Sequence, residues 1–417
     1  MGSGHFLVSV LNRLLFIKSY LDILLDKDGR RIRRSDWALE LENDEISILD
    51  DEGNPFVYSI NPERQRVQEA IFNEKRTIIE NCLFGVDINP ASVYICRLRL
   101  WIELLKNAYY TEESGFTQLE TLPNIDINIK FGNSLVSRYS IKTGSSILSE
   151  GNPDTRRLIR QYREAVAAYK NENNKENKRK VDSLIQSIKR QIHGVAQLSL
   201  FDEELNKKIL DDDIYADSLE WMIEFPEVLD ENGRFLGFNA VIGNPPYISS
   251  DNQRLNPILN KQREAIIKSH EYRSLYQKWD IYIPFIELGL KLGRENAICA
   301  MIVPFPLVNQ NYAKVLRRML LEENNLFELD DLNGRKIFDE ATVSNCIPFV
   351  RKSSPKLGEV SRSDDGVCLS FDTRPSQQAD SPSNLEGHLK NLEAEIDSLV
   401  YELYGLGDEE ISKIESK

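Results

Sequence analysis

Apolar residues recur along the chain with two periods, one typical of amphipathic helices and one typical of buried strands. The segments expected to be helices are 5–25, 62–81, a helix from about 90 onward, 279–292 and 312–323. The segments expected to be strands are short pieces within 30–60, then 82–87, 125–131, 238–243, 296–304, 326–332 and 343–350. Because strands and helices alternate, the sequence predicts an α/β fold with a parallel or mixed sheet and helices on both faces.

The helix that begins near Pro90 has an apolar stripe from which its buried face can be predicted. Proline suits the first turn of a helix, where its missing N–H costs nothing. The residues expected to face the core are Val93, Leu98, Trp101, Ile102 and Leu105.

Residues 151–200 differ from their surroundings in charge. Positions 151–190 hold eleven Lys or Arg against five Asp or Glu, with Asn-rich polar turns. We expect a long helical insertion, with a hairpin near 171–177. Two interpretations stay open, a solvated helical face and an arm that contacts phosphates.

The end of the chain has a linker-like composition followed by a helical pattern. Residues 352–386 are rich in Ser, Asp, Pro and Gln. From Leu392 onward an acidic amphipathic helix is expected, with Ile396, Leu399, Val400 and Leu403 on its apolar side.

Composition narrows the class of protein. The apolar fraction is 41%, and no apolar run reaches 18 residues, so no membrane span is expected. The five cysteines and four histidines are scattered, which favours reduced thiols in the cytoplasm and gives a metal site little support. The net charge of −14 counts against strong nonspecific DNA binding by the whole chain, although the local distribution of charge matters more.

The tetrapeptide Asn244-Pro245-Pro246-Tyr247 carries the strongest chemical signal. It ends the apolar run 238–243 and holds a side-chain amide on a stiff double-proline turn beside an aromatic ring. That arrangement suits a planar substrate amine. The alternative is a proline turn that merely ends a strand.

Three other segments stand at the ends of strands or the start of a helix, where α/β sheets bind ligands. Gly2-Ser3-Gly4-His5-Phe6 is a glycine-rich turn entering a helix, which can bring backbone N–H groups close to a ligand. Asp87-Ile88-Asn89-Pro90 offers a carboxylate for ribose hydroxyls, or simply caps a helix. Gly132-Asn133-Ser134 offers an amide for an adenine edge, or simply makes a turn.

Taken together, these segments resemble the adenine-N6 DNA methyltransferases, specifically the methyltransferase part of type IIG restriction–modification enzymes with an Asn-Pro-Pro-Tyr motif. The resemblance covers about 1–140, 215–350 and 390–417. It implies a Rossmann-like S-adenosylmethionine-dependent methyltransferase sheet with a helical insertion and a C-terminal helix. The cofactor would be bound by Gly2, Ser3, Gly4, Phe6, Asp87, Ile88, Asn133 and Ser134.

The resemblance also implies a mechanism and a partner. The Asn244 side-chain oxygen and the Pro245 carbonyl would each accept an N–H bond from the adenine amine, and the methyl group would be transferred directly without a metal. Tyr247 would stack on an adenine flipped out of double-stranded DNA. Pro246 completes the catalytic motif.

The chain departs from the family pattern at three places. Met1 stands just before Gly2, where the family has an acidic residue and Pro that follow an apolar strand. This first strand of the sheet is expected to be missing here. In the family pattern it would lie centrally, beside the strands ending at Asp87 and Asn244. The family has a target-recognition domain where this chain has only the linker-like residues 352–386. A recognition or nuclease component could therefore lie on the parent chain or on another subunit. Asn133 replaces the Asp of many relatives. We therefore expect weak or absent activity.

The expected organisation has five parts. They are a cofactor-binding half (1–140), a basic helical insertion (141–214), a catalytic half (215–351), a linker (352–386) and a C-terminal helical segment (387–417). Two other functions remain open. One is a protein-glutamine methyltransferase, because a glutamine amide is also a planar amine carrier. The other is a non-catalytic remnant or nucleic-acid-binding subunit.

Overall fold

The computed structural model describes residues 2–137, 153–171, 175–198, 215, 217–230, 232–332 and 344–353. The chain separates into two compact units, residues 1–355 and 356–417. The second unit, with the expected C-terminal helix and nearly all of the expected linker, lies outside the described residues.

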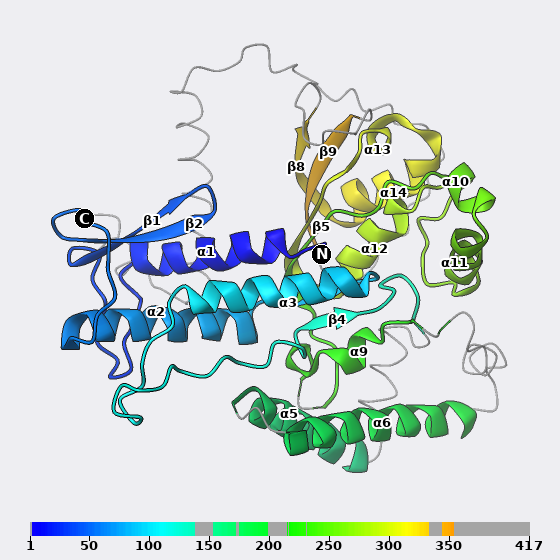
Figure 1. Ribbon diagram of the computed structural model, residues 1–417. Coiled ribbons are helices and arrows are strands. Elements are labelled where there is room, and N and C mark those ends of the chain that lie inside the picture. The colour runs from blue at the N-terminus through cyan, green and yellow to red at the C-terminus, as the bar shows by residue number, and fades with distance from the viewer. Residues whose placement is uncertain are drawn as a thin grey trace, which may run out of the picture. The chain divides into compact units, whose positions relative to one another are not determined.

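Three helices and a strand hairpin form the N-terminal half (Figure 1). The helices are α1 (His5–Tyr20), α2 (Pro62–Asn81) and α3 (Pro90–Leu105), and the hairpin pairs β1 (Trp37–Glu42) with β2 (Glu45–Asp50). Asn61 and Asn89 cap α2 and α3 by accepting backbone N–H bonds, so both helices begin where their Asn-Pro pairs predict. Their apolar sides meet in one core, which includes Leu11, Leu15, Ile71, Phe72, Ile79, Leu100 and Leu104.

The expected buried face of α3 is wrong at three of its five residues. Val93 is buried and Trp101 is partly buried, but Leu98, Ile102 and Leu105 are 44–50% exposed. The core instead takes the side that holds Cys96, Leu100 and Leu104. The helix has apolar residues on two sides, and helical spacing alone cannot show which of the two packs against α1 and α2.

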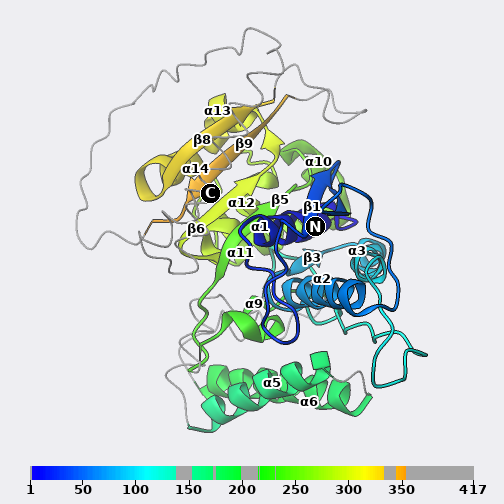
Figure 2. The ribbon, with the colours of Figure 1, turned by 90° about the vertical axis from the view of Figure 1, so that its left-hand side faces the viewer.

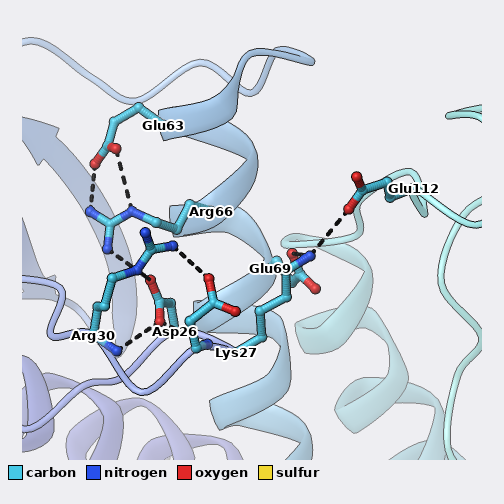
Figure 3. A network of polar contacts seen from close by, with 8 residues as sticks. Asp26, Lys27, Arg30, Glu63, Arg66, Glu69 and Glu112 are labelled. Atoms are coloured by element: carbon cyan, nitrogen blue, oxygen red, sulfur yellow. Dashed lines mark hydrogen bonds and ion pairs between the residues drawn. The ribbon is translucent and has the colours of Figure 1, made fainter.

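A charged network fastens the loop after α1 to α2 (Figure 3). The Asp26 side chain is 1% exposed, and its carboxylate accepts bonds from the guanidinium groups of Arg30 and Arg66 at 3.0 and 3.1 Å. Arg66 also pairs with Glu63 at 2.6 Å. Burial raises the pKa of Asp26, but the bonds from the Arg30 backbone and the Arg66 side chain outweigh burial and hold that pKa below its ordinary value.

Two short parallel strands, β3 (Gly85–Asp87) and β4 (Ile129–Phe131), follow this core. The pairing places Asp87 opposite Phe131. The strand expected at 125–131 is shorter than predicted, because the Ile129 N–H donates to the Ile125 carbonyl and closes a turn.

The basic insertion contains two helices that pack against each other, α5 (Pro153–Asn171) and α6 (Lys175–Leu198). The residues at the centre of the expected hairpin, 172–174, lie outside the described residues. Figures 1 and 2 both show this pair next to α9 (Trp221–Glu224), which the short helix η1 (Pro226–Val228) follows.

The C-terminal half is built on a mixed sheet in the order β5-β6-β9-β7, with β8 paired to β9. Its strands are β5 (Phe238–Gly243), β6 (Gly293–Met301), β7 (Val303–Pro304), β8 (Asn325–Asp331) and β9 (Asn345–Arg351). β5 and β6 are parallel, whereas β9 runs antiparallel to β6, β7 and β8. The fold is therefore α/β with a mixed sheet, as the sequence predicts.

The helices of this half follow two of the predicted segments and add others. They are α10 (Ser250–Leu255), α11 (Pro257–Lys268), α12 (Tyr282–Leu292), α13 (Pro306–Asn309), η2 (Asn311–Ala313), α14 (Lys314–Arg318) and the π-helical turn η3 (Met319–Glu323). α12 packs closely on the sheet. A Cβ atom at Gly289 would lie only 2.6 Å from the Cys299 sulfur, so this position admits no side chain. α10 and α11 were not expected from the sequence.

An aromatic junction joins the two halves. Phe84, just before β3, and Phe238, at the start of β5, have ring centroids 5.5 Å apart, and Phe225 packs against both. Trp221 and Phe235 complete the set. Among the described strands, β3 pairs only with β4 and β5 only with β6, so aromatic packing rather than a strand ladder links the halves here.

None of the described helices combines the length and apolar character needed to cross a membrane.

Candidate active site

Asp87 and the N-terminal glycine turn meet at the carboxyl end of β3. The Gly2 backbone N–H donates to one oxygen of the Asp87 carboxylate at 2.7 Å, and the Asn89 N–H donates to the other at 2.8 Å. Asn89 in turn caps α3 through its own side chain. The carboxylate thus bridges the glycine turn and the start of α3, two segments that the sequence places 85 residues apart.

The glycine turn lies so close to α3 that one of its residues must lack a side chain. Gly4 has φ +90°, and a Cβ there would lie 2.7 Å from the Cys96 sulfur. Gly2 also has positive φ, +59°, but has open space around it. Ser3, in the same turn, and Phe6, at the start of α1, are half-buried. Burial raises the pKa of Cys96 to about 11, so this thiol contributes volume rather than charge.

Apolar side chains stand exposed beside this carboxylate. Ile88, next to Asp87, is 49% exposed, and Phe131, opposite Asp87 in the β3–β4 ladder, is 43% exposed. Phe131 was not predicted as a site residue, although its place at the end of an expected strand was a usable signal.

Asn133 and Ser134 follow β4 in a tight turn. The Asn133 backbone pairs with the 217–219 segment, and its side-chain oxygen accepts the Leu135 N–H at 3.1 Å. The Ser134 carbonyl accepts the Trp221 indole N–H at 3.1 Å. The alternative prediction of a turn thus describes the local geometry. Within the described part of the chain, the side-chain N–H₂ of Asn133 donates no hydrogen bond and can serve other contacts.

The tetrapeptide begins where the β5–β6 ladder ends. Gly243 pairs with Met301, and the Ile302 N–H donates to the Gly243 carbonyl at 3.0 Å. Beyond this last bond, Asn244 is exposed while Pro245 is buried. The strand and the buried proline therefore hold the backbone, and the amide side chain reaches solvent.

Tyr247 is half-buried behind that amide. Its hydroxyl donates to the Ile302 carbonyl at 3.4 Å, and burial raises its pKa to about 12. The ring is therefore neutral at physiological pH.

Asp280 fixes the segment that follows the tetrapeptide. Its carboxylate accepts the Ser250 N–H at 2.9 Å and the Tyr312 hydroxyl at 2.8 Å. The Ile281 N–H donates to the Ile248 carbonyl beside it. Sequence reasoning missed Asp280, because nothing local distinguishes it and it lies more than 30 residues from the motif.

A buried arginine, Arg263, also stabilises the segment after the tetrapeptide, through Gln253. The Arg263 guanidinium stacks 3.8 Å from the Trp279 ring centroid and donates to the Gln253 side-chain oxygen at 2.9 Å. Gln253 donates to the Ile248 carbonyl at 3.2 Å. Two layers of hydrogen bonds thus hold residues 248–250, directly after the tetrapeptide.

The predicted site residues form two groups. Gly2, Gly4 and Asp87 are in one group and are held together by hydrogen bonding and packing; residues 244–247 are in the other. The aromatic junction sets both strands, β3 and β5, side by side at their starts. The N-terminal end of α1 lies beside β5 in both Figure 1 and Figure 2.

Comparison with known families decides the class of this site. Residues 81–338, more than half of the chain, match the model of the Eco57I restriction-modification methylase family. The chain belongs to this family. The matched segment begins before β3 and ends after β8, so it contains Asp87, Asn133 and the tetrapeptide. The chain therefore contains a restriction-modification methylase domain, a type of domain that implies S-adenosylmethionine as its cofactor.

Three curated relatives are similar to parts of the chain. The "Putative type II restriction enzyme and methyltransferase RM.MjaORFECS2P" of Methanocaldococcus jannaschii is 24% identical over 85% of this chain and 30% of its own length. The type II restriction enzyme and methyltransferase RM.Eco57I of Escherichia coli is 21% identical over 68% of this chain and 20% of its own length. The type II methyltransferase M.BstVI of Geobacillus stearothermophilus is 25% identical over 34% of this chain and 22% of its own length.

The chain spans 20–30% of the length of these relatives. A solved structure from Listeria monocytogenes, titled a putative class I S-adenosylmethionine-dependent methyltransferase, matches 38% of this chain and 53% of that chain at 10% identity. Its TM-score of 0.21 is too low to bear on the fold.

Proposed function

We propose that this chain is the methyltransferase part of a restriction–modification enzyme and methylates the exocyclic amine of adenine in double-stranded DNA. One observation supports this most directly. The exposed amide of Asn244 projects from a backbone held by the β5–β6 ladder and by the buried Pro245. A fixed amide oxygen next to a fixed carbonyl is what a planar amine requires of its binding site.

The residues around Asp87 fit the methyl donor. S-adenosylmethionine supplies a methyl group on a sulfonium when bound. The Asp87 carboxylate, with two lone pairs on each oxygen, can accept ribose hydroxyls in addition to its two backbone bonds. Ile88 and Phe131 offer exposed apolar surface for an adenine ring, and the Gly2–Gly4 turn admits a ligand close to its backbone. Asn133 and Ser134 would complete the adenine end.

The chemistry assigned to the tetrapeptide is to make a weak nucleophile reactive. The amine of adenine shares its lone pair with the ring. The Asn244 side-chain oxygen and the Pro245 carbonyl would each accept one of its N–H groups, which favours a more tetrahedral nitrogen. Because these acceptors are fixed before the reaction, they need no reorganisation when charge develops on the amine.

Tyr247 would capture the base. Stacking of an aromatic ring on a base contributes about 1–3 kcal/mol, which offsets much of the few kcal/mol needed to flip the base from the duplex. The bond from its hydroxyl to the carbonyl of Ile302, between β6 and β7, anchors the far end of the ring.

Transfer of a labelled methyl group tests the proposal. The chain is incubated with methyl-labelled S-adenosylmethionine and unmethylated genomic DNA, and the digested nucleosides are separated by mass spectrometry. We expect N6-methyladenine above the level given by the Asn244→Ala variant.

The same incubation separates the alternatives. A glutamine-containing peptide is offered in parallel with the DNA, and binding of S-adenosylmethionine is measured by calorimetric titration. Methylation of the peptide alone, or of cytosine alone, would overturn the adenine assignment. A chain that binds no S-adenosylmethionine would contradict the assignment of the Asp87 site and favour a non-catalytic role.

A further inference from the structure

The helix pair α5 and α6 buries one side against the methyltransferase fold. The Tyr162 hydroxyl, on α5, donates to the Ile223 carbonyl of α9 at 2.7 Å. The Asn124 side-chain amide donates to the Tyr169 carbonyl at 3.0 Å. Apolar residues fill the interface, including Ile159, Val166, Val181, Ile185 and Ile188. The orientation of the pair is therefore fixed by a packed core.

Cations on the inner side of the pair are neutralised by carboxylates of the fold. Lys170 pairs with Glu227 at 2.6 Å and is buried. On α6, Lys178 pairs with Asp126 at 2.8 Å, and Lys189 approaches Glu224 at 3.6 Å. These three lysines have a structural role and hold the pair in place.

The outer cations have a different setting. Arg156, Arg160 and Arg163 follow each other at i, i+4 and i+7, so they form one stripe along α5, and all three are exposed. No ion pair joins any of the three to a carboxylate within the described part of the chain. Lys175, Arg179 and Arg190 form a second exposed stripe, on α6.

These two stripes together form the basic face, which differs from the rest of the chain in the sign of its charge. The whole chain carries a net charge of −14, yet residues 153–198 hold eleven Lys or Arg and five Asp or Glu. The exposed carboxylates among the described side chains of the pair are Glu164, Glu176 and Asp182. Solvation alone does not require an excess of cations, because an acidic helical face like the rest of the chain would also be solvated. The local excess of Lys and Arg therefore favours a role in binding.

We propose that the basic face contacts the phosphates of double-stranded DNA outside the base that is methylated. The proposal rests on the proposed function, since it needs DNA as the substrate. Arg156 and Arg163 lie about 10 Å apart along the helix axis. That distance is about three phosphates of one strand at 3.4 Å of rise each. The basic face thus positions the duplex and reads no sequence.

Removing the α5 stripe tests this inference. In the variant Arg156→Gln, Arg160→Gln, Arg163→Gln, glutamine keeps helix propensity and removes only charge. Binding of the full chain to a fluorescently labelled duplex of random sequence is measured over a series of salt concentrations. We expect weaker binding and a plot of log affinity against log salt that is shallower by about three units, about 0.9 for each lost phosphate contact.

Two matched variants control for charge and for folding. Arg31→Gln, Arg33→Gln, Lys314→Gln removes three exposed cations elsewhere and should leave the slope unchanged. The conservative variant Arg156→Lys, Arg160→Lys, Arg163→Lys should keep most of the slope. An unchanged slope in the glutamine variant of the α5 stripe, or an equal loss in the control variant, would overturn the proposal.

Failure of this inference and failure of the proposed function give different results. Duplex binding is measured without S-adenosylmethionine and does not depend on methyl transfer. Suppose that the wild-type chain methylates adenine and that the glutamine variant binds duplex as tightly as the wild type. The proposed function is then retained, and the proposed contact of the basic face with DNA is rejected. Stronger competition by an RNA hairpin than by the duplex would also reject it.

Discussion

Asn244 has an exposed side chain on a backbone that is held on both sides. β6 holds the strand before it, and the buried Pro245 follows. Under the proposed function, Asn244→Ala removes an acceptor that acts mainly in the transition state. By analogy with single oxyanion-hole groups, we expect a loss of about 10²–10³ in kcat with the Kd for S-adenosylmethionine unchanged.

The matched control for this variant is Asn239→Ala, an exposed asparagine on the same strand. It should keep the wild-type rate. Full methyl transfer by Asn244→Ala would remove Asn244 from the mechanism.

Asp280 acts through the segment that it holds, as a positioning residue. Without its carboxylate, the Ser250 N–H and the Tyr312 hydroxyl lose their acceptor, and the segment after Tyr247 can shift. Since displacement of reacting groups by about 1 Å can cost about 10²-fold, we expect Asp280→Ala to lower kcat by about 10–100-fold.

Asp280→Asn keeps an oxygen acceptor and should retain more activity than the alanine variant. The exposed neighbour Asp251, 3.8 Å from Lys278, provides the control substitution Asp251→Ala. Steady-state kinetics with separate measurement of cofactor binding distinguishes the two effects. An equal loss in S-adenosylmethionine affinity would mean that Asp280 supports the fold generally and not the catalytic segment.

At the scale of elements, the contact between the glycine turn and α3 depends on two glycines with different surroundings. Gly2→Ala meets only the cost of positive φ, about 1–2 kcal/mol. Gly4→Ala meets the same cost and in addition a clash with Cys96, about 1–3 kcal/mol more. Chemical denaturation should therefore rank Gly4→Ala well below Gly2→Ala in free energy of unfolding. Equal stabilities would show that the turn moves away from α3.

The network around Asp26 makes the loop after α1 sensitive to acid. Its pKa is lowered in the folded chain, so the network stabilises the fold above the unfolded carboxyl pKa of about 3.9 and loses this effect as pH falls through the lower folded value. We expect the free energy of unfolding to drop as pH falls below about 4, and Asp26→Asn to reduce that dependence while destabilising the chain by about 1–3 kcal/mol at neutral pH.

The exposed neighbour Asp28, which pairs with Arg30 at 2.7 Å, is the control for this prediction. Asp28→Asn should leave the acid dependence nearly unchanged, because an exposed ion pair contributes little. Denaturant unfolding at a series of pH values measures both variants. An Asp26→Asn chain with the wild-type pH dependence would contradict the role of the network.

Local signals in the sequence were enough to place many elements. The Asn-Pro pairs at 61–62 and 89–90 mark the starts of α2 and α3, and the run 238–243 is β5. The buried side of α3 could not be predicted, since Leu98 and Leu100 are equally apolar and only the positions of α1 and α2 choose between them. The contact of Gly2 with Asp87 could be expected only from the resemblance, and Asp280 depends on tertiary packing that leaves no mark in the sequence.

At the scale of the whole molecule, the first unit contains two large cores joined by the aromatic junction. One core lies among α1, α2 and α3, and the other lies under α12 and the sheet of β5. Phe225 is fully buried in the junction, so Phe225→Ala should weaken the link between them. We expect calorimetric unfolding to broaden or split, with a van't Hoff enthalpy below the calorimetric enthalpy.

Phe72→Ala, a buried residue of the N-terminal core alone, is the comparison. It should lower the stability of one core and leave the link intact. A single sharp transition in Phe225→Ala would show that contacts outside the junction unite the cores.

The aromatic junction also bears on how long the protein survives in a cell. Where the rings meet, the two cores can separate locally without full unfolding, and such openings are where proteases cut. Under the proposed function, a methyl donor that touches both the Asp87 side and the Asn244 side closes this opening, by about 2.7 kcal/mol at a concentration one hundred times its Kd. The supply of the donor would then set the lifetime of the enzyme as well as its rate.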